Sequence, residues 1–129
     1  MNREQNNSKS VQVDTTGFNS EVMRSRQPVL AAFLATWSRP CQVLEPVLDE
    51  IAATCRGKLK VVRINADENP DICLWYDIRS IPTLVYFVAG GVRWRVVGTV
   101  SKADVLSRLE LPPPPTSVLK GKGIPESEG

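Results

Sequence analysis

The stretch "FLATWSRPCQVLEPVLDEIA", residues 33–52, changes its hydrophobic pattern at Ser38. Before this position, residues 28–37 are almost all apolar, which is typical of a central strand buried on both faces. After it, apolar residues recur at spacings of three and four, which predicts an amphipathic helix over residues 40–55. The apolar positions of that helix are Val43, Leu44, Val47, Leu48 and Ile51.

The start of this helix carries the residues that decide the chemistry. Ser38 stands where an N-cap is expected, and Pro40 suits the first turn, where its missing N–H is not needed. Cys41 follows within that turn. Pro46 falls inside the helix, where it removes one backbone hydrogen bond and is expected to bend the axis.

Four more strands are predicted from alternating or continuous apolar patterns. Two of them, separated by Gly90 and Gly91, suit an antiparallel hairpin whose register the glycines leave open. These four strands are expected at residues 10–14, 58–67, 83–90 and 92–98.

Three shorter helices are predicted between or after these strands. The first covers residues 15–25 with Asn19 or Ser20 as possible caps, and the second covers residues 69–78. In the second, Asn69 is expected as the cap and Pro70 at the first helical position. The third covers residues 101–110 and opens on a serine cap.

The resulting order, β-α-β-α-β-α-β-β-α, predicts a layered α/β domain with helices on both faces of one sheet. The domain is expected to cover residues 10–110. Residues 1–9 are polar and are expected to form a flexible arm. Residues 111–129 are rich in Pro, Gly and Ser, and are predicted to be a disordered tail, although a Pro-rich recognition motif is an alternative.

Composition excludes several classes of function. Among 129 residues the net charge is +2 without a concentrated basic patch, which argues against nucleic-acid binding. No stretch is apolar enough to span a membrane and the N-terminus lacks an apolar signal segment, so a cytoplasmic location is expected. The chain has no histidine and its three cysteines lack C-x-x-C spacing, so neither a metal nor another cofactor is expected.

Several separated motifs together resemble the thioredoxin family over about residues 10–110. They are "TWSRPCQ" with the later mid-helix proline, "INADENPDICLWYDIRSIPTLVYFVAGG" and "VVGTVSKADV", in the family's order. The resemblance implies a thioredoxin fold, with a mixed five-stranded sheet and four flanking helices. It also implies that the peptide bond before Pro82 is cis and that Pro82 faces the active-site loop.

Two departures from the family affect the mechanism. The family motif Cys-Gly-Pro-Cys is replaced by Ser38-Arg39-Pro40-Cys41, and a buried family Asp is replaced by Ala32. In the family the first cysteine attacks a disulfide and the second, shielded one resolves the mixed disulfide. Cys41 corresponds to the resolving cysteine, so the attacking thiolate is missing. An unpaired carboxylate at position 32 would cost stability, and it has no purpose once the first cysteine is gone.

The peptide-binding surface of the family could survive these changes. The resemblance places it at Trp37, Arg39, Pro40, Ile81, Pro82 and Gly98, with Ala66, Ser80 and Val97 nearby. Trp37 either faces such a ligand or packs on its own loop. Arg39 is either a solvated side chain or a charge that attracts acidic partners and activates Cys41.

The other two cysteines are expected to have no redox role. Cys55 lies at the far end of the long helix, roughly 21 Å from Cys41 at ~1.5 Å per residue, too far for a disulfide. Cys73 lies on the next helix, which the family resemblance places on the opposite face of the sheet, and it is expected to fill the core there.

These features predict a thiol/disulfide redox-homeostasis protein with one active-site cysteine and with weak or no dithiol reductase turnover. Cys41 would form a mixed disulfide with a protein thiol, or the surface would bind extended peptide segments. Thioredoxin reductase and glutathione are the candidate redox partners. The alternative is a non-catalytic, chaperone-like binding module, because fold alone does not establish activity.

Overall fold

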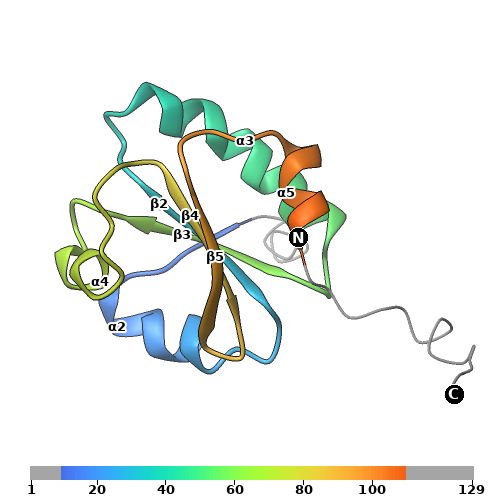
Figure 1. The fold of residues 1–129 in the computed structure, drawn as a ribbon. Coiled ribbons are helices and arrows are strands. Elements are labelled where there is room, and N and C mark those ends of the chain that lie inside the picture. The colour runs from blue at the N-terminus through green and yellow to red at the C-terminus, as the bar shows by residue number, and fades with distance from the viewer. Residues whose placement is uncertain (1–9, 110–129) are drawn as a thin grey trace, which may run out of the picture.

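The computed structural model describes residues 10–109, and the order of strands and helices predicted from the sequence is confirmed (Figure 1). The predicted arm and tail lie outside the described residues. The strands are β1 (Val11–Gln12), β2 (Val29–Leu34), β3 (Lys60–Asn65), β4 (Thr83–Val88) and β5 (Gly91–Val97). The helices are α2 (Thr15–Phe18), its continuation η1 (Asn19–Met23), α3 (Arg39–Thr54), α4 (Pro70–Trp75) and α5 (Lys102–Arg108).

The strands form one mixed sheet in the order β1-β3-β2-β4-β5. β1, β3 and β2 run parallel, whereas β4 runs antiparallel to both β2 and β5. β2 is therefore the central strand, and all six of its residues are buried. This agrees with its continuous apolar sequence, because a strand covered on both faces has no polar side.

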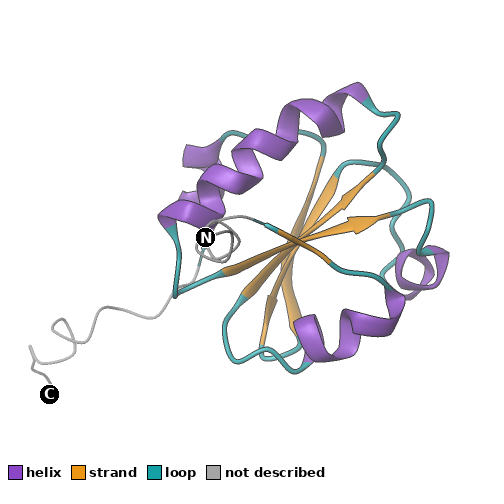
Figure 2. Cartoon of the chain, turned by 180° about the vertical axis from the view of Figure 1, so that it is seen from behind, coloured by secondary structure: helices purple, strands orange, loops and turns teal. Residues whose placement is uncertain are grey.

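Helices cover both faces of the sheet, with α3 and α5 on one side and α2 and α4 on the other (Figures 1 and 2). The alternating residues of β2 therefore belong to two separate hydrophobic clusters. Leu30, Ala32 and Leu34 pack with α3 and α5. Ala31 and Phe33 face the other cluster, together with Phe18 of α2.

The cap predicted for the first short helix is wrong. Asp14 is the N-cap, and its carboxylate accepts hydrogen bonds from the Gly17 amide at 3.0 Å and the Thr16 hydroxyl at 2.7 Å. These bonds hold the pKa of the Asp14 carboxyl below its usual value. Asn19 and Ser20 lie inside the helical segment, because α2 continues into the wider turns of η1 instead of starting there.

Asn69 occupies the predicted cap position of α4, but its side chain does not cap the helix. Its carbonyl oxygen accepts from the Thr15 amide at 2.8 Å and from the Thr15 hydroxyl at 3.0 Å, and its amide nitrogen donates to the Asn65 carbonyl. The side chain thus joins the start of α2 to the loop that follows β3.

The β4–β5 hairpin turns at Ala89 and Gly90, which both have positive φ, 52° and 82°. A Cβ atom at Gly90 would lie 2.9 Å from the Met23 carbonyl oxygen, so only glycine fits there. The register left open by the sequence contains an irregularity between Tyr86 and Phe87.

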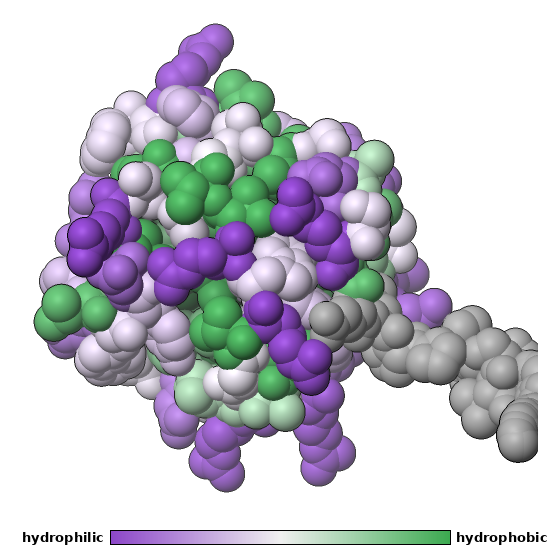
Figure 3. Space-filling view, in the orientation of Figure 1, coloured by the Kyte–Doolittle hydropathy of each residue, from purple (hydrophilic) through white to green (hydrophobic). Residues whose placement is uncertain are grey.

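One edge of the sheet is β5. Its exposed residues include the two apolar side chains Val92 and Val97 and the two cations Arg93 and Arg95, and Figure 3 shows green and purple surface interleaved on this side. Charged side chains on an edge strand oppose pairing with another strand. We therefore regard this edge as protected.

Candidate functional site

The start of α3 places Ser38 and Cys41 as the sequence predicted. Ser38 is the N-cap, and its Oγ accepts a hydrogen bond from the Cys41 amide at 3.4 Å. Pro40 lies in the first turn, where its lack of an N–H costs nothing. Ser38, which carries a hydroxyl, therefore occupies the positive end of the helix dipole, the position at which a thiolate would be stabilised.

Cys41 occupies an inner position. Its side chain belongs to the cluster that α3 packs on the sheet, and its relative exposure is 0%, against 5% for Ser38. The Cys41 sulfur accepts a weak hydrogen bond from the Ala35 amide at 3.4 Å. A partner sulfur cannot reach Cys41 Sγ unless the loop before α3 moves.

A partly buried cation, Arg63, lies on the α3 side of the sheet. Arg63 of β3 pairs in register with Ala32 of β2, and both point toward the α3 side of the sheet. The Nε atom of Arg63 is buried and has no hydrogen-bond partner. A carboxylate at position 32 would therefore have a hydrogen-bond donor, Arg63, beside it, whereas the sequence alone predicted that it would be unpaired.

A small cavity of about 70 Å³ adjoins Arg63. Leu34, Ala35 and Glu45 are among the residues that line it. Glu45 of α3 is thus the acidic side chain that shares this cavity with Arg63. Periodicity marks Arg63 only as a strand residue and gives no sign that its Nε atom is buried without a partner.

The loop before β4 faces the start of α3. The Ile81–Pro82 peptide bond is cis. The Pro82 carbonyl accepts from the Gly98 amide at 2.8 Å, and the Ser80 carbonyl accepts from the Thr83 hydroxyl at 2.6 Å. These bonds attach the segment around Ile81 and Pro82 to the end of β5 and to the start of β4.

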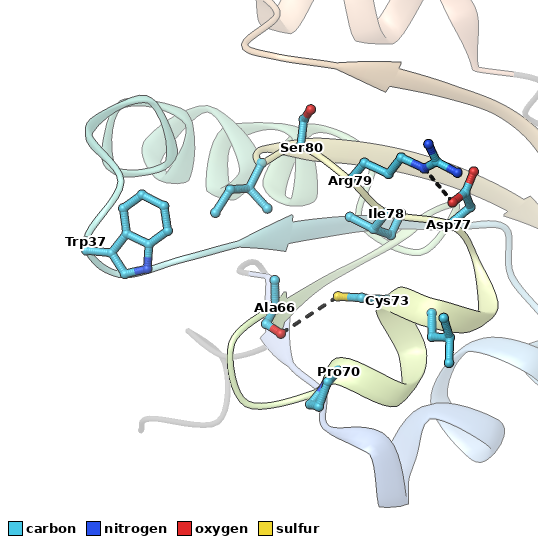
Figure 4. Close-up of a pocket in the computed structure, with 10 residues that line it drawn as sticks. Trp37, Ala66, Pro70, Cys73, Asp77, Ile78, Arg79 and Ser80 are labelled. Atoms are coloured by element: carbon cyan, nitrogen blue, oxygen red, sulfur yellow. Dashed lines mark hydrogen bonds and ion pairs between the residues drawn. The ribbon is translucent and has the colours of Figure 1, made fainter.

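A groove of about 590 Å³ opens beside this segment (Figure 4). Trp37 forms one wall, with 69% of its surface exposed, and its Nε1 donates to Asp67 at 2.7 Å. Trp37 is thus held open toward solvent and does not fold onto its own loop. The other lining residues are Ala66, Pro70, Cys73, Leu74, Asp77, Ile78, Arg79, Ser80 and Ile81.

Comparison with known proteins agrees with this fold. The thioredoxin family model matches residues 9–110. The chain is 48% identical to a thioredoxin of Griffithsia pacifica over 99 residues, which cover 77% of this chain and 91% of that one. It is 47% identical to thioredoxin 1 of Nostoc sp. over 103 residues, covering 80% and 96% of the two chains. The chain belongs to the thioredoxin family.

The predicted thioredoxin fold, a five-stranded mixed sheet with four helices, is therefore confirmed. Membership of the thioredoxin family places the chain among thiol–disulfide redox proteins. A chloroplastic M-type thioredoxin of Chlamydomonas reinhardtii is also similar, 41% identical over 98 residues that cover 76% of this chain and 70% of that one. Within residues 10–109, no helix is long and apolar enough to cross a bilayer.

The structure brings some of the residues of the predicted peptide-binding surface together and separates others. Trp37 and Ile81 both line the groove, with Pro82 following directly. Arg39 and Pro40 are exposed at the start of α3 but do not line it. Gly98 contacts the Pro82 carbonyl from the far side of the loop.

Cys73 is the residue that the sequence reasoning missed. It lies on the predicted face of the sheet, yet it lines the groove and is only partly buried, so it is not merely core filler. Its thiol points toward the Ala66 carbonyl, 3.8 Å away. Burial, and secondarily the Asp67 charge, raise the pKa of this thiol, which disfavours the thiolate at neutral pH.

The described residues 10–109 hold no group of three acidic, cysteine or histidine side chains that could bind a metal. Cys55 lies at the end of α3 and is buried, and burial raises the pKa of its thiol. The candidate site thus has two chemically distinct features: the enclosed Cys41 sulfur at the start of α3, and the open groove beside Trp37 and Ile81.

Proposed function

We propose that this protein serves thiol/disulfide redox homeostasis with a single active-site cysteine, Cys41, and with weak or no dithiol reductase turnover. Its main activity is the binding of extended segments of protein partners in the groove beside Trp37 and Ile81. The observation that carries the proposal is the arrangement at the start of α3. The N-cap position, where a thiolate would be activated, holds the Ser38 hydroxyl, and the Cys41 sulfur has no exposed surface.

Dithiol turnover requires two steps at this place. A first cysteine thiolate attacks one sulfur of the substrate disulfide, forms a mixed disulfide and displaces the other sulfur. A second cysteine thiolate then attacks the sulfur of the first cysteine, forms a disulfide with it and releases the reduced substrate. Ser38 cannot perform the first attack, because a hydroxyl neither ionises readily there nor forms a disulfide. A mixed disulfide at Cys41 would require movement of the loop before α3 and an external thiol, such as glutathione, for release.

A second candidate, a binding module without any covalent step, is favoured by the enclosure of Cys41. Binding uses surfaces that remain open: the face of Trp37 and the segment before Pro82. Exposed aromatic side chains beside an apolar groove are typical of sites that recognise protein segments. The cytoplasmic location and the pairing with thioredoxin reductase stay predictions.

The proposal predicts that binding survives removal of the active-site sulfur. A fluorescently labelled, reduced and carboxymethylated protein, which has no free thiol, should bind Cys41→Ser and wild type with affinities within about twofold. Trp37→Ala should weaken binding about tenfold or more, as expected for a central tryptophan. Fluorescence polarisation measures all three affinities.

Trp75→Ala is the matched control, because Trp75 is 59% exposed but lies outside the groove. It should leave the affinity within about twofold of wild type, a difference too small for a hot spot. Equal losses in Trp37→Ala and Trp75→Ala would show that binding is not centred on the groove. Loss of binding in Cys41→Ser would overturn the proposal.

A further inference from the structure

The groove beside Trp37 has an asymmetric charge. Between residues 65 and 80, which supply all of the lining except Trp37 and Ile81, the chain carries four acidic side chains and one basic one. The chain as a whole is positive, with a net charge of +2. The α4 side of the groove is therefore negative against the trend of the molecule.

The acidic groups lie close to the apolar surface. Asp67 accepts the hydrogen bond of the Trp37 indole, so one carboxylate stands directly at the edge of that ring. Asp71 is exposed in the first turn of α4, between the lining residues Pro70 and Cys73. The raised pKa of the Cys73 thiol, to which Asp67 contributes, indicates that this negative charge acts inside the groove.

The basic group of the same stretch is already engaged. Arg79 Nε lies 2.8 Å from Asp77 Oδ1, and Arg95 of β5 donates to the Asp77 carbonyl, so the Asp77 end of the groove has no excess of negative charge. Asp67, at the edge of the Trp37 ring, and the exposed Asp71, next to the lining residue Pro70, remain as the negative charges on the α4 side. Arg39, exposed at the start of α3, is the nearest opposing cation in sequence to Trp37.

We propose that the groove selects extended protein segments in which apolar side chains are flanked by lysine or arginine. This inference rests on the proposed function and adds the class of segment that the groove accepts. The apolar side chains contact Trp37, Leu74 and Ile81, and the flanking cations lie beside Asp67 and Asp71. Charge complementarity of this kind raises association rates and sets specificity, and it weakens with salt.

Three short peptides with one apolar core, flanked at both ends by lysine, glutamine or glutamate, test this inference. Titration at low salt should rank affinities lysine above glutamine above glutamate, with about tenfold or more between the extremes, and high salt should remove most of the difference. Binding of the glutamine peptide reports the proposed function alone. If no peptide binds, the proposed function fails; if all bind equally, only the charge selection fails.

The Asp71→Lys variant should lower the affinity for the lysine peptide and raise that for the glutamate peptide while keeping the affinity for the glutamine peptide. The control variant is Glu50→Lys, which replaces an exposed glutamate of α3 away from the groove by a cation. It should keep the wild-type ranking of the three peptide affinities. A wild-type preference for the glutamate peptide would point to Arg39 instead and would overturn the inference.

The described structure ends at residue 109, and the following segment "SVLKGKGIP", residues 117–125, has the same basic and apolar character. A chain truncated after residue 110 should bind the lysine peptide with an affinity at most about twofold higher than that of the full chain. A change of this size is expected from removing distant charged residues of the 111–129 segment, whose effect is screened by salt. A gain of tenfold or more would mean that this segment, and not a partner protein, occupies the groove, and would overturn the inference.

Discussion

Ser38→Cys should reduce insulin disulfides about a hundredfold or more faster than the wild-type protein when dithiothreitol supplies the electrons. The substitution places a thiol at the N-cap of α3, where unpaired backbone N–H groups and the helix dipole stabilise a thiolate. Cys41, three residues later, is already positioned to act as the second thiol. The rate of insulin precipitation, followed by turbidity, measures the gain.

The double variant Ser38→Cys/Cys41→Ser separates attack from resolution. Its new thiol should attack the substrate and accumulate as a mixed disulfide, visible by mass spectrometry, while turnover stays near the wild-type level. If Ser38→Cys is as slow as the wild type although it is folded, the cap position is not what limits turnover. The mechanistic interpretation of the motif would then be wrong.

Ala32→Asp should cost about 1 kcal/mol or less of unfolding free energy, although Ala32 is fully buried. The new carboxylate would face Arg63, whose buried Nε lacks a partner, and buried ion pairs with good hydrogen bonds come close to neutral in stability. Urea unfolding followed by far-ultraviolet circular dichroism gives the free energy.

Ala31→Asp is the matched control, because Ala31 is equally buried on the same strand but faces the opposite cluster. No cation pairs with it in the register of β2 and β3, so the buried carboxylate should cost about 4 kcal/mol or prevent folding. Adding Arg63→Met to Ala32→Asp should destabilise that variant by about 3 kcal/mol. Equal losses for the two aspartates would refute the pairing.

Local sequence signals predicted the elements well because their causes are local. The uniform apolar run of β2 and the three–four spacing of α3 each require only one segment, and Ser38 caps its helix through its own neighbouring amide. Asp14 was not predicted as the N-cap of α2, because it falls at the end of the strand predicted over residues 10–14. Residues 19 and 20 resemble cap residues but are enclosed by a continuing helical segment.

The site was less predictable because it depends on how separate elements pack. The prediction that Cys73 fills the core follows from the family resemblance, which places its helix on the opposite face of the sheet, but the groove arises where α4, the loop before Pro82 and Trp37 meet. Similarly, the unpaired Arg63 Nε appears only when α3 closes over β3. No spacing rule within one segment contains this information.

The native reactivity of Cys41 toward a maleimide tests the central claim most directly. In the folded chain, Cys41 should label about a thousandfold or more slowly than in urea, because it must wait for a rare opening. Cys73 should label in the native state, and increasingly with rising pH, since burial raises its pKa. Mass spectrometry of the digested protein assigns each label. Rapid native labelling of Cys41 would contradict the account, because the remaining sulfur would then be open to partners.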